Sequence, residues 1–184
     1  MIIPNKKTPA LSLPLVGGGH FDLSKEIPDF ATLIVAYRGL HCPICVSYLT
    51  ELDRMTPDFA ASGVTTIAVS MDGQEKTQSM ADKIGVKSLR IAHDMTLETA
   101  RNWGLYISQQ IQETEPKLFS EPGVFLVKPD QTLFYISVQS MPAVRPQLND
   151  ILGVVNFAIK ANYPARGDYV TDLLSNNQIK DRHE

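Results

Sequence analysis

The chain of 184 residues contains only two cysteines, Cys42 and Cys45, separated by two residues. A disulfide between them would close a very short loop and would restrict the unfolded chain little. We therefore do not expect them to serve as structural cross-links. A single Cys-x-x-Cys pair in a reducing compartment instead indicates redox or metal chemistry.

The segment around the cysteines reads Tyr37-Arg-Gly-Leu-His-Cys-Pro-Ile-Cys45. It follows an apolar, β-branched run typical of a buried strand, and Pro43 fits the first turn of a helix, where its missing N–H is not needed. Cys42 is thus predicted at or near the helix N-cap, where the helix dipole and unpaired N–H groups stabilise a thiolate. Cys45, one turn further, is placed to attack an oxidised Cys42 and close a disulfide.

Other interpretations of this segment stay open. Arg38 and His41 are candidates to support a thiolate by positive charge or hydrogen bonds, but a surface ion pair for Arg38 and a backbone hydrogen bond for His41 fit the sequence equally well. The cysteines could also be inert thiols. A zinc site would need more ligands, and the nearest histidines (His20, His41 and His93) show no recognisable spacing, so no metal is expected.

The hydrophobic periodicity predicts alternating strands and helices. We expect strands at 32–37, 64–70, 89–92, 123–127 and 133–138, and helices at 43–60, 74–84, 97–103 and from Pro146 onward. Asp72 is the expected cap of the second helix and Gly85 its end. Asp53, on the first helix, is expected to be solvated. Residues 105–121 are polar and are expected to run irregularly over the surface.

The order of these elements predicts an α/β fold. A turn at Gly17–Gly19 indicates a small N-terminal hairpin extension. Alternating strands and helices predict a mixed central sheet flanked by helices, and an antiparallel hairpin followed by a last helix is the thioredoxin arrangement. We expect one thioredoxin-like domain over residues 1–168 and a C-terminal tail over 169–184.

Composition excludes several classes of function. The net charge is -3 and no basic run occurs, so neither nucleic acid nor an anionic membrane surface is an expected partner. The N-terminus lacks the apolar core of a signal peptide, and the longest apolar stretch, 151–159, is too short to span a bilayer, so we expect a cytoplasmic protein. The three consecutive glycines lack the spacing of a nucleotide loop, and no cofactor is expected.

Several segments together resemble the peroxiredoxin-like branch of the thioredoxin superfamily, the alkyl hydroperoxide reductase and thiol-specific antioxidant proteins. The resemblance is carried by Tyr37–Cys45 and the helix after it, Glu121-Pro-Gly-Val-Phe-Leu126, Arg145-Pro146 and Tyr163-Pro-Ala-Arg-Gly167. It covers roughly residues 5–168, and the Cys-Pro-Ile-Cys region is its most specific part.

The resemblance implies a peroxidatic role for Cys42, which peroxide would oxidise to a sulfenic acid, and a resolving role for Cys45. It implies a thioredoxin- or glutaredoxin-like reductant as the partner, and a possible homodimer. Thioredoxin-fold proteins also place a cis-proline opposite the cysteine pair, and Pro122 is the candidate here.

The chain departs from the Pro-x-x-x-Thr-x-x-Cys signature of typical peroxiredoxins. Gly39 occupies the threonine position and Val35 the proline position, so the hydroxyl expected to orient peroxide is missing. Two alternatives therefore remain: a thiol–disulfide oxidoreductase without peroxidase activity, and a redox-sensing binding module.

Overall fold

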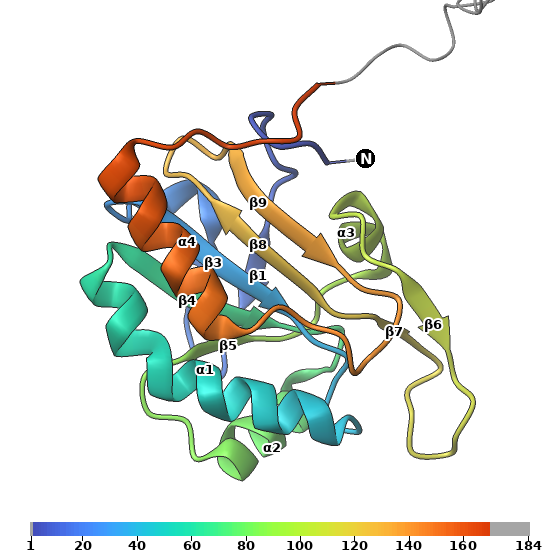
Figure 1. Ribbon diagram of the computed structural model, residues 1–184. Coiled ribbons are helices and arrows are strands. Elements are labelled where there is room, and N and C mark those ends of the chain that lie inside the picture. Colours follow the sequence, from blue (N-terminus) through green and yellow to red (C-terminus); the bar gives the residue numbers. More distant parts are fainter. Residues whose placement is uncertain (1, 170–184) are drawn as a thin grey trace, which may run out of the picture.

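The computed structural model describes residues 2–169 and is built around a five-stranded mixed sheet (Figure 1). The strand order is β5-β4-β3-β8-β9. The strands are β3 (Ala31–Ala36), β4 (Val64–Val69), β5 (Arg90–Ala92), β8 (Gly123–Val127) and β9 (Leu133–Val138). The pairs β3–β4 and β4–β5 are parallel, whereas β8 is antiparallel to both β3 and β9. The predicted thioredoxin-like fold is confirmed.

Helices and a hairpin bury both faces of this sheet. The helices are α1 (Pro43–Ala61), α2 (Gln74–Ile84), α3 (Leu97–Asn102) and α4 (Leu148–Ala161), and a short 3-10 helix, η1, spans Leu23–Lys25. In β3, Leu33 and Val35 point to a core shared with α1, α2 and α4. Two of these helices, α1 and α4, lie in front of the sheet in Figure 1. Ile34 and Ala36 point to a second core, shared with α3 and the N-terminal hairpin. This alternation explains why β3 reads as a continuous apolar run.

The N-terminal hairpin is present as predicted, with β1 (Ser12–Pro14) antiparallel to β2 (His20–Asp22). The expectation of an irregular 105–121 segment was wrong. Here β6 (Ile107–Gln109) pairs with β7 (Leu118–Ser120) in a second antiparallel hairpin. Each of these strands has only three residues, which is too short for an alternating pattern to be detected among polar neighbours.

Two finer expectations also need correction. Asp72 does not cap α2, because Gly73 is the N-cap residue and makes no side-chain cap; the αL end at Gly85 is as predicted. The last helix begins at Leu148 rather than Pro146. The predicted tail, 169–184, lies outside the described residues apart from Tyr169, so the boundary at 168 stays a prediction. Among residues 2–169, no helix is long and apolar enough to cross a membrane.

Asp53 is buried, against expectation, and its carboxylate accepts hydrogen bonds from the backbone N–H groups of Lys87, Ser88 and Leu89 at 2.8–3.2 Å. These residues form the turn between α2 and β5. Burial alone would raise the pKa of Asp53, but the three N–H groups outweigh it and lower that pKa below its ordinary value. The carboxylate thus stabilises the fold above pH ~4, and this contribution is lost as pH falls through the lowered pKa.

Replacing Asp53 by alanine is expected to lower the free energy of unfolding by about 2–3 kcal/mol at neutral pH, because buried N–H groups lose their acceptor. Urea unfolding at neutral pH and below pH ~3 measures this, and the difference between the two proteins should shrink in acid. Asp58, exposed on the same helix, is the control: Asp58→Ala should change stability by less than about 0.5 kcal/mol. Equal effects of the two substitutions would contradict the assignment.

Candidate active site

The two cysteines lie where β3 gives way to α1, at the carboxyl end of the central strand. Cys42 is the N-cap residue of α1 and Pro43 occupies the first helical position, as predicted. The Cys42 Sγ accepts a hydrogen bond from the backbone N–H of Cys45 at 3.3 Å. Cys42 is 1% exposed and Cys45 0%, and both are free thiols. The site is therefore a reduced, enclosed pair at a helix N-terminus.

Arg145, which precedes α4, reaches both sulfurs. Its Nη2 lies 3.1 Å from the Cys45 Sγ and 3.9 Å from the Cys42 Sγ. The guanidinium packs 5.4 Å from the ring centre of Tyr48, whose hydroxyl donates to the Pro146 carbonyl at 2.9 Å. Sequence reasoning did not place Arg145 among the site residues. The only signal for it was the Arg145-Pro146 pair noted in the resemblance.

These contacts separate the pKa values of the two thiols. The Cys45 thiol donates to the Cys42 sulfur, and together with the Cys45 N–H and the Arg145 guanidinium it lowers the pKa of Cys42 to about 5 against the opposing effect of burial. Burial raises the pKa of Cys45, with Arg145 opposing that change. At neutral pH the pair therefore holds one thiolate and one thiol, with the thiolate at the helix N-terminus.

The Arg38 side chain pairs with two carboxylates, those of Glu115 and Glu121. Its guanidinium forms ion pairs with Glu115 at 3.3 Å and Glu121 at 3.1 Å, and it lies 4.6 Å from the ring centre of Phe119. The alternative of an ion pair is thus the correct one, although the pair is buried rather than on the surface.

His41 packs edge-on against Phe119, with ring centres 4.8 Å apart. Both of its ring nitrogens are buried, and neither has a hydrogen-bond partner among the described residues. Burial and the nearby Arg38 charge lower the pKa of His41, so the imidazole is neutral at pH 7. Its ring also lines a cavity of about 110 Å³ beside Asp72. The alternative left open by the sequence, a hydrogen bond from the His41 side chain to the backbone, is absent among residues 2–169.

Gly39 and Asp72 fix the turn that leads into Cys42. Gly39 has a φ of +135°, which L side chains rarely adopt, and a Cβ at this position would lie 2.6 Å from the Asp72 Oδ2. That carboxylate accepts the Leu40 N–H at 2.7 Å, and the Gly39 carbonyl accepts the Cys42 N–H at 3.1 Å. Asp72 thus occupies the space where a threonine side chain would begin.

Pro122 joins β7 to β8, and its carbonyl accepts the Gln139 N–H at 2.9 Å. Pro122 was a candidate for a cis-proline whose isomer the sequence left open, and residues 2–169 contain no cis peptide bond. The isomer of a proline is set by its tertiary surroundings, which the sequence does not reveal.

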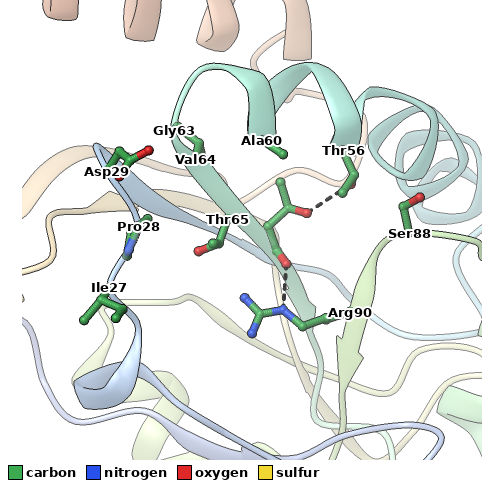
Figure 2. A pocket seen from close by; sticks show the side chains of 11 residues that line it. Ile27, Pro28, Asp29, Thr56, Ala60, Gly63, Val64, Thr65, Ser88 and Arg90 are labelled. Carbon is green, nitrogen blue, oxygen red and sulfur yellow. Dashed lines mark hydrogen bonds between the residues drawn. The ribbon is translucent and has the colours of Figure 1, made fainter.

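Away from the thiols, a cavity of about 360 Å³ opens at the far end of α1 (Figure 2). Its walls include Thr56, Thr66 and Arg90, and their polar atoms already pair with one another: Thr56 with Thr66 at 3.0 Å, and the Arg90 Nε with the Thr66 carbonyl at 3.4 Å. No group of three His, Cys, Asp or Glu side chains within the described part of the chain could hold a metal ion. The chemistry of the molecule therefore concentrates at Cys42 and Cys45.

Comparison with known proteins agrees with this geometry. A family model described as the AhpC/TSA family matches residues 4–136, whereas no curated protein matches the chain. Among solved structures, a cysteine-to-serine variant of peroxiredoxin 6 from Arenicola marina is 18% identical, with a TM-score of 0.74 over 89% of this chain and 76% of that one.

Two further structures are similar. AhpC from Enterococcus faecalis is 15% identical, with a TM-score of 0.70 over 93% of this chain and 99% of that chain. A yeast mitochondrial 1-Cys peroxiredoxin, whose thiol is described as resolved via glutathione/thioredoxin systems, is 15% identical, with a TM-score of 0.71 over 88% and 78% of the two chains. At sequence identities of 15% and 18%, the similarity of the chain to these structures concerns the fold alone.

Proposed function

The chain belongs to the AhpC/TSA family, and we propose on this basis that it reduces peroxides through a Cys42 sulfenic acid that Cys45 resolves. Membership of this peroxiredoxin family makes the chain a thiol-based oxidoreductase. The finer proposal is carried by the contact of Arg145 with both sulfurs and by the place of Cys42 at the N-cap of α1, where the pKa of Cys42 is lowered while burial raises that of Cys45.

In the first step the Cys42 thiolate attacks one peroxide oxygen. An S–O bond forms, the O–O bond breaks, and the departing alkoxide or hydroxide takes up a proton, which leaves a sulfenic acid on Cys42. In the second step the Cys45 sulfur attacks the Cys42 sulfur and gives up its proton. The S–O bond breaks, hydroxide leaves as water, and a Cys42–Cys45 disulfide forms. Because Arg145 touches both sulfurs, one cation stabilises the reacting anion in each step.

The supporting residues have separate parts in this proposal. Pro43 begins α1 and leaves Cys42 at the N-cap, where the helix dipole favours its anion. His41, neutral and buried, adds no charge beside the thiolate. Pro122, between β7 and β8, accepts the Gln139 N–H through its carbonyl and is proposed only as a support of the neighbouring strands.

Recycling of the disulfide requires two electrons from an external dithiol. We propose a thioredoxin- or glutaredoxin-like reductant, since the yeast structure with a similar fold is described with glutathione/thioredoxin systems. We also propose a homodimer, because Val154 and Phe157 expose apolar surface on α4. A cytoplasmic location stays a prediction.

The test is to count free thiols in the reduced protein before and after one equivalent of hydrogen peroxide, together with the rate of their loss. Wild type should lose both thiols rapidly. Cys45→Ser should accumulate a sulfenic acid that a carbon nucleophile traps, and Cys42→Ser should react no faster than a small-molecule thiol. Loss of the wild-type thiols at that slow rate would contradict the peroxidase proposal.

A second candidate is thiol–disulfide exchange without peroxidase activity. It is favoured by Gly39, which supplies no hydroxyl to orient a peroxide. Under this alternative the reduced protein would ignore peroxide yet reduce a protein disulfide repeatedly when a dithiol is supplied. A redox sensor would instead be oxidised once and stop.

A further inference from the structure

The Arg145 guanidinium reaches the two sulfurs without a carboxylate to hold it there. Two other arginines, Arg38 and Arg90, are each fixed by glutamate side chains at 2.8–3.3 Å. Arg145 pairs with no carboxylate of residues 2–169, and its buried Nε has no hydrogen-bond partner among them. Because fixing a long side chain costs rotamer freedom, another group of the fold must hold this cation in place.

The backbone that carries Arg145 has few ties to the rest of the fold. Within residues 140–146, one backbone group makes a hydrogen bond to another element of the described chain: the Pro146 carbonyl accepts the Tyr48 hydroxyl at 2.9 Å. Pro146 also restricts the residue before it, Arg145, to extended conformations. The Tyr48 hydroxyl thus fixes the point from which the Arg145 side chain starts.

The ring of Tyr48 holds the other end of the same side chain. The Arg145 Cζ lies 5.4 Å from the ring centre of Tyr48, within the range of a cation–π attraction. Tyr48 follows Cys45 by three residues on α1, so the two side chains are neighbours on the helix surface. Burial raises the pKa of Tyr48, and its hydroxyl therefore keeps the proton that it donates to Pro146.

We propose that Tyr48 is a positioning residue, which holds the Arg145 guanidinium on the Cys42 and Cys45 sulfurs by its ring and its hydroxyl together. The inference deepens the proposed function and rests on it, because Arg145 stabilises the reacting anion in both steps of that proposal. Tyr48 acts through Arg145, so the effects of replacing the two residues should not be additive.

The experiment is a double-mutant cycle on the oxidation of Cys42 by hydrogen peroxide. Tyr48→Leu removes both contacts with the Arg145 segment, and Tyr48→Phe removes the hydroxyl alone. We expect Tyr48→Leu to slow oxidation about 10- to 100-fold and Tyr48→Phe about 2- to 10-fold, as misplacement of a group at a reacting centre does. In the Arg145→Met background, Tyr48→Leu should change the rate less than about 2-fold. The midpoint of the thiolate titration should move toward the ordinary thiol value in the same order.

The matched control is Tyr163→Phe, which removes a hydroxyl that accepts a hydrogen bond from Arg166 at 3.2 Å. It should leave the rate and the titration unchanged. A crystal structure of reduced Tyr48→Leu should show the Arg145 Nη2 beyond hydrogen-bond distance of the Cys45 sulfur.

The proposal is overturned if the guanidinium keeps this contact in Tyr48→Leu, or if Tyr48→Leu slows Arg145→Met by the same factor as wild type. It is also overturned if Tyr163→Phe slows oxidation equally. Should Tyr48→Leu not fold, Tyr48→Phe, which keeps the ring, decides by the same cycle. A wild type inert to peroxide would refute the proposed function, whereas the crystal structure and the thiolate titration would still test how Arg145 is held.

Discussion

Replacing Arg145 by methionine should slow the reaction of Cys42 with hydrogen peroxide by about 100-fold or more, the usual effect of losing a preorganised charge at a reacting anion. Methionine keeps much of the volume over Tyr48 but removes the guanidinium that lies 3.1 Å and 3.9 Å from the two sulfurs. Stopped-flow oxidation at a fixed pH measures the effect. Arg166→Met is the matched control, because Arg166 is exposed and its hydrogen bond within residues 2–169 goes to the Tyr163 hydroxyl, so its loss should leave the rate unchanged.

Arg145→Met should also shift the pH dependence of the thiol reaction. With the pKa of Cys42 lowered to about 5, the wild-type rate of thiol alkylation should rise through that pH and be flat at neutrality. Arg145→Met should shift this rise toward the ordinary thiol value of ~8.5. Ultraviolet absorbance of the thiolate gives the midpoint directly. A midpoint unchanged in Arg145→Met would show that the Cys45 contacts alone stabilise the thiolate.

The lowered pKa of Cys42 also determines whether the protein gains or loses stability as pH rises. Because the folded chain binds fewer protons at Cys42 than the unfolded chain between pH ~5 and ~8.5, unfolding should become harder as pH rises across that window. The contribution is fully present above the unfolded value and is lost as pH falls through the folded one. Cys42→Ser should remove it.

Introducing the threonine of typical peroxiredoxins, by Gly39→Thr, should destabilise the chain by about 3 kcal/mol or more. The left-handed φ of +135° disfavours any β-branched residue, at a cost of order 1–3 kcal/mol. Its Cβ would also lie 2.6 Å from the Asp72 Oδ2, which must move and release the Leu40 N–H. Peroxide reactivity should fall with stability, and denaturant unfolding measures the loss.

Substitutions at two other glycines separate the cost of backbone strain from the cost of the clash with Asp72. Gly85 has a φ of +63° and open space where a side chain would begin, and Gly153 lies inside α4, also with open space around it. Gly85→Ala should show the backbone strain alone, about 1 kcal/mol, and Gly153→Ala should be stabilising by about 0.5–1 kcal/mol. A Gly39→Thr protein as stable as wild type and faster with peroxide would contradict the account of the turn.

Local patterns predicted most of the fold. The strands β3 and β4 are continuous apolar runs, and α1 shows a regular stripe of buried residues from Cys45 to Phe59, so periodicity alone located them. Cys42, Pro43 and Cys45 took their predicted places for the same reason, because cap and first-turn preferences act over a few residues.

The rest of the site depends on contacts between distant segments. Arg145 is 103 residues from Cys42, and Glu115 is 77 residues from Arg38, so no local pattern links them. Asp53 shows the same limit, since its N–H donors lie more than thirty residues away. A polar side chain on a helix reads as solvated until the turn that covers it is known.

The position of Arg145 late in the chain has a consequence for biosynthesis. A ribosome releases the cysteine pair long before the arginine that contacts both sulfurs, which lies 100 and 103 residues further on. Until then the Cys42 thiol lacks the guanidinium that, with the contacts of Cys45, lowers its pKa in the folded protein. The complete site, with Arg145 on both sulfurs, therefore forms only when most of the chain has been made.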